Sequence, residues 1–405
     1  LAMADNGVAP DTTAGDGIYA ATIPASAYGV GDMIRWAVTA TDTAGNASRD
    51  PLVLDQATNS QNPLYYGTVA IDPAEPVDPP VWLWFAANVA AARTEAGTRG
   101  SVLWNGVFYD NIYVRRRGGY TNTNAQKFDF NKGHTLHVNA TLPSVGEVNL
   151  NGPGSDGSYL RQTMAFTYHQ LAGNPGCESF WVAMRVNGAT DRLGILIEQV
   201  DEDYLKRHGL PDTGDLYKFV QRANNNPALS DTTTGIEKKT NDQTDLTTAQ
   251  ALVDALVLPT AAERRAFLYD YVDLPEVINF FGARIVMEHA DDVRKNFYMY
   301  KDIEGDGLWR IFPWDLDWIF GIVGGHGNAP KHPFFGTQEV PTEDGANQWC
   351  RFHDTLFEPV EIQRMALRRA RTLMDAHLKP PGAPVTDSWF NNWITTQWPH
   401  ISTQS

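Results

Sequence analysis

The segment from His289 to Gly321 most limits what this chain can fold into, because it alternates polar groups with two apolar runs. Asp291 and Asn296 lie five residues apart, directly before the run Phe-Tyr-Met-Tyr. A turn and a second apolar run then lead to Asp315 and Asp317. Two antiparallel strands joined by a turn have their outer ends at the same edge of a sheet. The pattern therefore predicts a hairpin that brings these polar groups together.

Such a set of groups suits phosphoryl transfer, in which one carboxylate orients the attacking hydroxyl while an amide and a second carboxylate hold metal ions. The spacing D-x-x-x-x-N, followed by a strand and an acid near a Phe-Gly pair, is typical of kinases. Asp or Asn before a strand also commonly caps or turns the chain, so that alternative stays open. However, Asp315 and Asp317 stand between Trp314 and Trp318, and buried carboxylates are costly unless they are paired or bind metal.

The overall composition excludes several classes of protein. A chain of 405 residues is expected to form two to three domains. Its formal net charge of -16 argues against general affinity for nucleic acid or anionic membranes, although an acidic surface could favour a basic protein substrate. No apolar run has membrane-spanning length. Cys177 and Cys350 are too few for a cysteine-based zinc site, and either one disulfide or two thiols would be compatible with the sequence. The start at Leu1, without Met or a signal peptide, suggests a fragment or a processed chain.

Residues 1–71 differ from the rest in composition, because they are rich in Ala, Thr, Gly and Asp. They contain short runs of alternating apolar and polar residues at 17–23 and 33–40. Asp-Gly turns separate these runs, which predicts an antiparallel β-sandwich. The pattern resembles the Ig-like modules of bacterial extracellular proteins. Asp11 and Asp16 could bind calcium, but turn residues are the preferred interpretation. The Pro-rich residues 72–80 predict an extended linker.

The remainder, 81–405, predicts an α+β domain with a β-rich first half (about 81–200) and an α-rich second half (about 201–405). This two-lobed plan is expected for a nucleotide-dependent transferase. Strands are predicted at Val102–Val114 and Phe128–Val138, with a hairpin of residues 180–186 and 193–199 joined by Asn187-Gly188. Helical periodicity predicts helices at Ser158–Leu171, Asp201–Arg207, Ala249–Leu256, Ala261–Tyr271, Leu274–His289 and Pro359–Leu378.

Several residues of the first half are candidates for nucleotide contacts. The turn at Arg117-Gly118 can bring backbone N–H groups to phosphates, and the next strand presents Lys127. The apolar run 195–200 ends in a polar crossover like the adenine-binding hinge of kinases. Lys218 could reach phosphate or pair with a surface acid. A hairpin with solvated Arg and Lys side chains, beside an ordinary core strand, is the alternative for these segments.

An ordered set of short motifs now points to one family. The motifs are Arg117-Gly118 then Lys127, Asp156 with Leu160-Arg161-Gln162, Val186-Asn187-Gly188 with the run 194–199, Leu216-Tyr217-Lys218, Tyr271-Val-Asp-Leu-Pro, Lys295-Asn296-Phe-Tyr-Met-Tyr, and Phe312-Pro-Trp-Asp-Leu-Asp317 with Phe320-Gly321. Each is weak alone, but the order is specific. From about Leu103 to Leu378 the chain resembles the CotH kinase family, named for a spore-coat protein with an atypical protein-kinase fold.

The resemblance implies a secreted or surface-located bacterial protein Ser/Thr kinase that uses ATP and Mg²⁺ or Mn²⁺. Its partner would be a protein acceptor, Ser/Thr-rich or basic and itself secreted. The implied site residues are Lys127 at the α/β-phosphates, with Arg117, Gly118 and Lys218 as further nucleotide contacts; Glu198 and Gln199 at the adenine hinge; Asp291 or the adjacent Asp292 as catalytic base; and Asn296, Asp315 and Asp317 around the metal.

The chain departs from the family pattern at two places. Gly119-Tyr120 follow the Arg-Gly pair where small residues are usual. The helix predicted at 158–171 contains no Glu to pair with Lys127. That role could fall to Asp156 or Glu147, or be absent.

Two other functions remain open from the sequence. A surface adhesion or structural protein could retain a kinase-like domain that no longer catalyses, although it would have no need for Lys127, Asp291, Asn296 and Asp315 together. A nucleotidyl (AMP) transferase could use the same groups with the nucleotide reversed, and the sequence does not separate this activity from phosphorylation.

Overall fold

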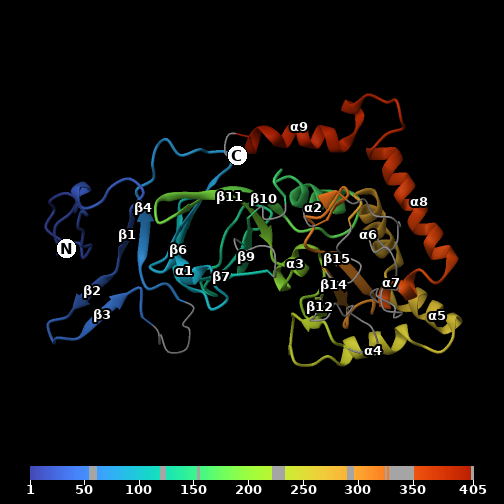
Figure 1. The fold of residues 1–405 in the computed structure, drawn as a ribbon. Helices are drawn as coiled ribbons and strands as arrows, with labels where there is room; N and C mark the ends of the chain where they lie inside the picture. Colours follow the sequence, from blue (N-terminus) through green and yellow to red (C-terminus); the bar gives the residue numbers. More distant parts are fainter. Residues whose placement is uncertain are drawn as a thin grey trace.

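The computed structural model describes residues 1–53, 62–118, 125–152, 156–220, 233–289, 296–323, 326–327 and 351–402; for 322–323 and 326–327 only the backbone is described. The fold is α+β, with the N-terminal strands at one end, a barrel in the middle and most helices at the other end (Figure 1). No helix in the described ranges has the length and apolar character needed to cross a membrane.

The N-terminal segment forms two separate antiparallel ladders. Strand β1 (Met33–Trp36) pairs with β4 (Tyr66–Val69), and β2 (Val38–Thr41) pairs with β3 (Ala47–Asp50). A short 3₁₀ helix, η1, spans Ala25–Ala27. Asp110 of the barrel accepts the backbone N–H groups of Leu64 and Tyr65, each at 2.9 Å. The segment is therefore anchored to the barrel, and the full Ig-like sandwich stays a prediction.

Seven strands close into a barrel in the order β10-β11-β9-β8-β7-β6-β5, with β10 and β5 parallel and the other neighbours antiparallel. The strands are β5 (Val81–Phe85), β6 (Thr98–Trp104), β7 (Val107–Arg116), β8 (Gln126–Asp129), β9 (Glu147–Asn151), β10 (Ser179–Val186) and β11 (Ala189–Glu198), with the short helix α1 (Val89–Ala92) after β5.

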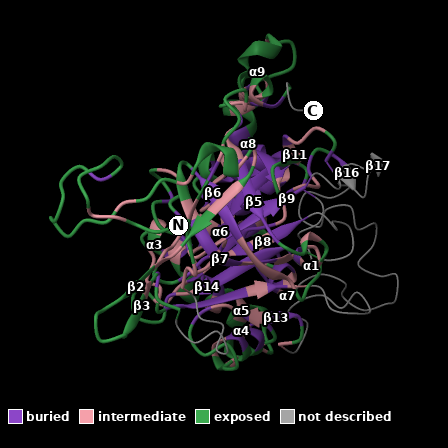
Figure 2. Ribbon diagram, turned by 90° about the vertical axis from the view of Figure 1, so that its left-hand side faces the viewer, coloured by how far each residue is buried: buried purple, intermediate pink, exposed green. Residues whose placement is uncertain are grey.

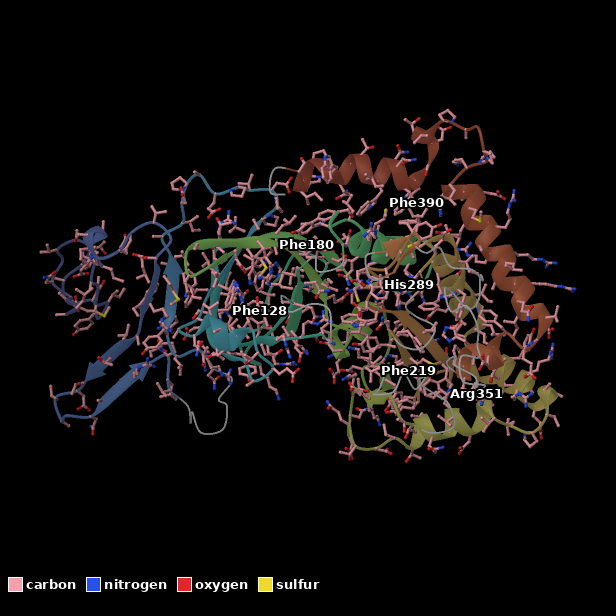
Figure 3. The ribbon with its side chains drawn as sticks, in the orientation of Figure 1. Phe128, Phe180, Phe219, His289, Arg351 and Phe390 are labelled. Carbon is pink, nitrogen blue, oxygen red and sulfur yellow. The ribbon has the colours of Figure 1, made fainter. Side chains whose placement is uncertain are left out.

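Strand β5 shows how the barrel is filled, because both of its faces are buried. Trp82 and Trp84 pack with Phe128 of β8 in the barrel core, whereas Leu83 and Phe85 join Val69 of β4 in a separate cluster. Alternate residues of a strand point to opposite faces, so one run of five large apolar residues serves both clusters. Figure 2 shows this buried centre in purple, and Figure 3 marks Phe128.

The strand predicted at 102–114 is wrong, because the chain reverses at Asn105-Gly106. These two residues have φ values of 48° and 78°, as a tight two-residue hairpin turn requires. The strand predicted at 128–138 is also too long, since β8 ends at Asp129. The hairpin predicted at Asn187-Gly188 is confirmed, with both residues again at positive φ.

The second half is built on the four-stranded antiparallel sheet β13-β12-β14-β15. Its strands are β12 (Asp215–Phe219), β13 (Ile236–Lys238), β14 (Phe297–Lys301) and β15 (Trp309–Pro313); a further pair is β16 (Ile322–Val323) and β17 (His326–Gly327). The helices are α2 (Arg161–Leu171), α3 (Glu202–Arg207), α4 (Thr247–Leu256), α5 (Ala261–Tyr271), α6 (Leu274–Val286), α7 (Arg351–Leu356), α8 (Val360–His377), η4 (Val385–Asp387) and α9 (Trp389–Ile401). The predicted helices are all present, with some ends shifted, whereas α1, α7 and α9 were not predicted.

One hydrophobic core joins the barrel to the sheet. It contains Trp181 and Ile195 from the barrel strands together with Tyr298 and Phe312 from β14 and β15. The chain crosses between the halves after β11, where Asp201 caps α3 by accepting the N–H groups of Asp203 (3.0 Å) and Tyr204 (3.2 Å). The candidate residues lie on both sides of this junction.

Candidate functional site

The pairing of three strands brings Asn296 and Asp315 to one end of the sheet. Phe297 pairs with Phe219 on one side and with Pro313 on the other, so Asn296 and the residues after Pro313 leave the sheet at the same end. Asn296 is 7% exposed, and Asp315 is half-buried. Both adopt left-handed backbone conformations, with φ values of 66° and 58°. Such conformations are uncommon outside Gly and recur at functional sites.

Two cations interact with the charge of Asp315 and lie over the ring of Trp314. The guanidinium carbon of Arg117 is 5.0 Å from the Trp314 ring centroid, and the Lys218 Nζ is 5.5 Å from it. Arg117 also donates a 2.9 Å hydrogen bond to Asn151 Oδ1 at the end of β9. Lys218 lies 5.9 Å from the ring of Tyr298 as well. The barrel and the sheet thus each contribute one cation to the same place.

Burial governs the pKa values of these two cations. It lowers the pKa of Arg117, while the negative charge of Asp315 opposes that shift. Burial also lowers the pKa of Lys218 to about 8, with Arg117 lowering it further and Asp315 raising it. Two partly desolvated cations therefore share one carboxylate, and an additional anion at this place would be favoured electrostatically.

Lys127 on β8 forms an ion pair with Glu147 on β9. Lys127 stands directly opposite Asn149, so Glu147 is its diagonal neighbour across the ladder. Burial lowers the pKa of Lys127 to about 8, against the opposing effect of Asp129. Asp156, the other partner considered for Lys127, instead pairs with Arg161 at 2.9 Å at the start of α2.

The expected hinge residues Glu198 and Gln199 lie where the chain crosses from β11 to α3, and their side chains bind different partners. Glu198 is 2% exposed and accepts from Arg207 Nε at 2.7 Å and from the Glu178 N–H at 2.9 Å. Burial raises the pKa of Glu198, against the effect of Arg207. Gln199 Oε1 accepts from Asn149 Nδ2 at 3.0 Å. The Glu198 carboxylate is thus engaged inside the protein, whereas Gln199 contacts the residue opposite Lys127.

The remaining predicted residues are only partly described. Asp291 and Asp292 lie outside the described residues, between the buried His289 and Asn296. Gly118 is exposed with a φ of 86°, a conformation suited to Gly, and stands just before undescribed residues. Asp317 is half-buried two positions after Asp315. Cys177 is a buried free thiol, and Cys350 lies outside the described residues.

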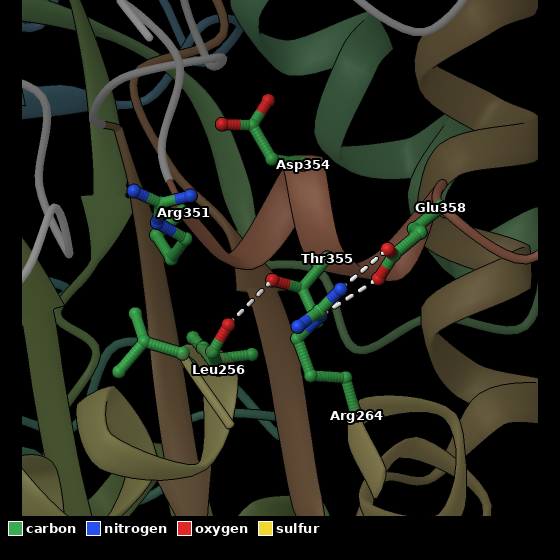
Figure 4. A pocket seen from close by; sticks show the side chains of 7 residues that line it. Leu256, Arg264, Arg351, Asp354, Thr355 and Glu358 are labelled. Atoms are coloured by element: carbon green, nitrogen blue, oxygen red, sulfur yellow. Dashed lines mark hydrogen bonds and ion pairs between the residues drawn. The ribbon is translucent and has the colours of Figure 1, made fainter. Parts of the chain in front are cut away.

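Two further features include none of the residues predicted for the kinase site. Oxygen atoms of Asp5, Asp11 and Asp16 lie within 4.8 Å of one another, but Asp11 already accepts N–H groups from Asn6 (2.6 Å) and Gly7 (2.5 Å), as turn residues do. A pocket of about 400 Å³ lies where α4, α5 and α7 meet (Figure 4). It is lined by Leu256, Val257, Arg264, Arg351, Asp354, Thr355 and Glu358 and contains none of the predicted site residues.

Sequence reasoning missed helix α9, which reaches the segment that carries Asp315. The ring of Phe390 on α9 lies 5.3 Å from that of Phe320, measured between centroids. The signal was present, because Trp389, Phe390 and Trp393 follow Ser388 with the spacing of one helix face.

The family comparison matches this region. Residues 114–380 match the family model described as CotH kinase protein. The chain belongs to this family. The matched range begins near the end of β7 and includes every residue predicted for the site, whereas α9 follows it.

A curated relative supports the same assignment. Inner spore coat protein H of Bacillus subtilis (strain 168) is 24% identical to the chain over 189 residues, which is 45% of this chain and 52% of the relative. The chain thus spans about half the length of the relative that it matches.

Proposed function

We propose that the chain is an ATP- and divalent-metal-dependent protein Ser/Thr kinase. The observation that carries this proposal is that Arg117 from the barrel and Lys218 from the sheet both lie over Trp314, and both interact with the charge of Asp315. Lys127 lies close enough to Arg117 for their charges to interact. Membership of a family described as kinase supports the same reaction class.

The three cations are suited to holding a polyphosphate. Arg117 and Lys218 lie over Trp314, and Lys127 is kept in place on a barrel strand by Glu147. Charge-assisted hydrogen bonds to phosphate are stronger than neutral ones, and partial burial increases their strength further. Lys127 would contact the α/β-phosphates, with Arg117, Lys218 and the backbone of Gly118 as further contacts. The backbone at Glu198-Gln199 would face the adenine.

Asn296 and Asp315, with Asp317 nearby, would hold the metal. Their amide and carboxylate oxygens are the donor type that Mg²⁺ takes, so the residues fit the ion that the reaction needs. Bound there, the ion would neutralise charge that develops on the transferring phosphoryl group. The charge of Asp315 interacts favourably with both Arg117 and Lys218.

Asp291, or the adjacent Asp292, would accept the proton of the attacking Ser or Thr hydroxyl. Both precede Asn296 on the segment that enters β14, so the base and a metal-binding residue would come from one loop. The γ-phosphoryl group would pass to the hydroxyl oxygen, the bond from the β–γ bridging oxygen would break, and ADP would leave.

We further propose the division into an Ig-like module (1–71), a linker (72–80) and the kinase domain (81–405). A location at a bacterial surface or outside the cell is proposed from the spore-coat name of the relative. The acceptor would be a protein at that location, Ser/Thr-rich or basic. The formal charge of -16 is compatible with a basic acceptor.

Calorimetry with a non-hydrolysable ATP analogue and Mg²⁺ tests the site. Wild type should bind one equivalent, and Lys127→Met should bind at least tenfold more weakly because a desolvated phosphate contact is lost. Lys206→Met is the matched control, since Lys206 is an exposed lysine paired with Asp212 at 2.9 Å. A folded wild-type protein that binds no analogue would contradict the proposal.

A further inference from the structure

Helix α9 connects parts of the domain that are far apart in sequence. It follows α8 and runs back over the barrel (Figure 1), so that the last turn of α9 lies near the Pro-rich residues 72–80. The ring centroids of Trp393 on α9 and Trp181 on β10 are 6.0 Å apart. Ile401 is 1% exposed and belongs to the hydrophobic core that joins the barrel to the sheet. The ring Nδ1 of His400, near the end of α9, forms a hydrogen bond with the carboxylate of Asp78 in the Pro-rich segment. The helix therefore contacts both halves of the domain.

At its other end, α9 meets the segment that contains Asp315 and Asp317. The rings of Phe390 and Phe320 are 5.3 Å apart and perpendicular, a favourable edge-to-face arrangement. Phe390 also lies 4.7 Å from Tyr168 of α2, so one side chain joins α2 to this segment. Phe390 is 6% exposed and is labelled at the start of α9 in Figure 3.

Phe320 needs such support because of its backbone. Its φ is 55°, a left-handed conformation that is unfavourable for a bulky residue, and its side chain is 37% exposed. Its N–H donates to the carbonyl of Met287 at the end of α6, at 2.7 Å. The hydrogen bond to Met287 and the ring contact with Phe390 thus hold this conformation from two sides. Strained residues persist only where the surroundings fix them.

We infer that Phe390 is a positioning residue: by packing on Phe320 it fixes the segment 315–321 and so the carboxylates of Asp315 and Asp317. This inference rests on the proposed function for its effect on metal binding. Phe390 lies outside residues 114–380, the range that matches the family model. The contact with Phe320 therefore depends on a helix that the family model does not cover. Loss of the contact would widen the range of Asp315 positions, which weakens a metal site that needs defined geometry.

Two measurements on the full chain test the inference. Hydrogen exchange of peptides covering 314–321 should be at least tenfold faster in Phe390→Leu than in wild type. Calorimetric titration of the analogue-bound protein with Mn²⁺ should give a dissociation constant about tenfold higher, the usual cost of losing support behind a metal site. Trp398→Ala is the control, because Trp398 lies on the same helix and is 45% exposed. It should leave both values unchanged.

The outcomes separate this inference from the proposed function. Unchanged exchange of 314–321 in Phe390→Leu would overturn the positioning role, whatever the metal affinity. A similar increase in exchange across all of α2, α6 and α9 would show a general structural role and would also overturn it. Wild type that binds neither analogue nor Mn²⁺ would contradict the kinase proposal, while faster exchange confined to 314–321 would still support the role of Phe390.

Discussion

Lys127 and Glu147 form an ion pair between two neighbouring strands of a closed barrel. In protein kinases the glutamate that pairs with the phosphate-binding lysine comes from a helix whose position controls activity. Here the ladder register of β8 and β9 sets the separation of the two residues. The pair is therefore fixed by the fold of the barrel rather than by the placement of a movable helix.

Glu147→Gln should weaken nucleotide binding and change its pH dependence. If Lys127 contacts phosphate as proposed, it does so only in its protonated form. Burial lowers the pKa of Lys127 to about 8, so the affinity should fall as the pH rises through this value. Removing Glu147 removes an anion that favours the charged form, so the fall should begin at a lower pH. The charged groups that remain around Lys127 are Asp129, Arg115, Arg117 and Asp201. Calorimetry with the ATP analogue between pH 6 and roughly 9 gives the profile.

Glu95→Gln serves as the control for this profile. Glu95 pairs with Arg116 at 2.7 Å on the same barrel but is 79% exposed. Its removal should not change affinity at any pH. An unshifted profile in Glu147→Gln would contradict the role of the ion pair.

Lys218→Met should lower the affinity for the nucleotide about tenfold or more, because one of the three cationic side chains proposed to contact phosphate would be lost. The methionine keeps an apolar chain against Trp314 and Tyr298, so the melting temperature should change little. Both quantities can be measured on the same preparation by calorimetry and by thermal unfolding. If affinity is retained while stability falls, Lys218 supports the core instead of the ligand.

Glu198→Ala should destabilise the protein without a direct effect on the ligand. The substitution leaves Arg207 and the Glu178 N–H without their buried acceptor, a loss of about 3–5 kcal/mol for a broken buried pair. Denaturant unfolding measures this loss. Glu178→Ala is the matched control, since Glu178 lies 3.7 Å from the same arginine but is 29% exposed; it should cost under about 1 kcal/mol. A stable Glu198→Ala protein with lost nucleotide affinity would place this side chain at the adenine after all.

Much of the fold follows from local sequence. The periodicity of 261–271 gave α5 with its ends correct, since Thr260 and Glu263 form a capping box there. Asn187-Gly188 marked a hairpin in the same way, but the equivalent Asn105-Gly106 was overlooked, and one predicted strand is therefore two. The closure of the barrel could not be predicted, because the pairing of β10 with β5 joins residues about a hundred positions apart.

The part of the candidate site that is built by the β14–β15 hairpin could be predicted from the sequence. The convergence of Asn296 with Asp315 follows from two adjacent strands and one turn. The choice of Glu147 over Asp156 as the partner of Lys127 depends on ladder register, which the sequence does not display. The contact between Phe320 and Phe390 depends on how α9 returns over the domain, and spacing along the chain gives no information about it.

The most direct test of kinase activity is label transfer from ATP carrying the label on either the γ- or the α-phosphate. Purified wild type and Asp315→Asn would be compared with Mg²⁺ or Mn²⁺ and a basic generic acceptor. We predict transfer from the γ position only, reduced at least 1,000-fold in Asp315→Asn, because the metal-binding charge is lost while the shape is kept. Label from the α position would indicate a nucleotidyl transferase. No label from either position, with folded wild type, or near-full activity in Asp315→Asn, would contradict the proposed reaction or its metal site.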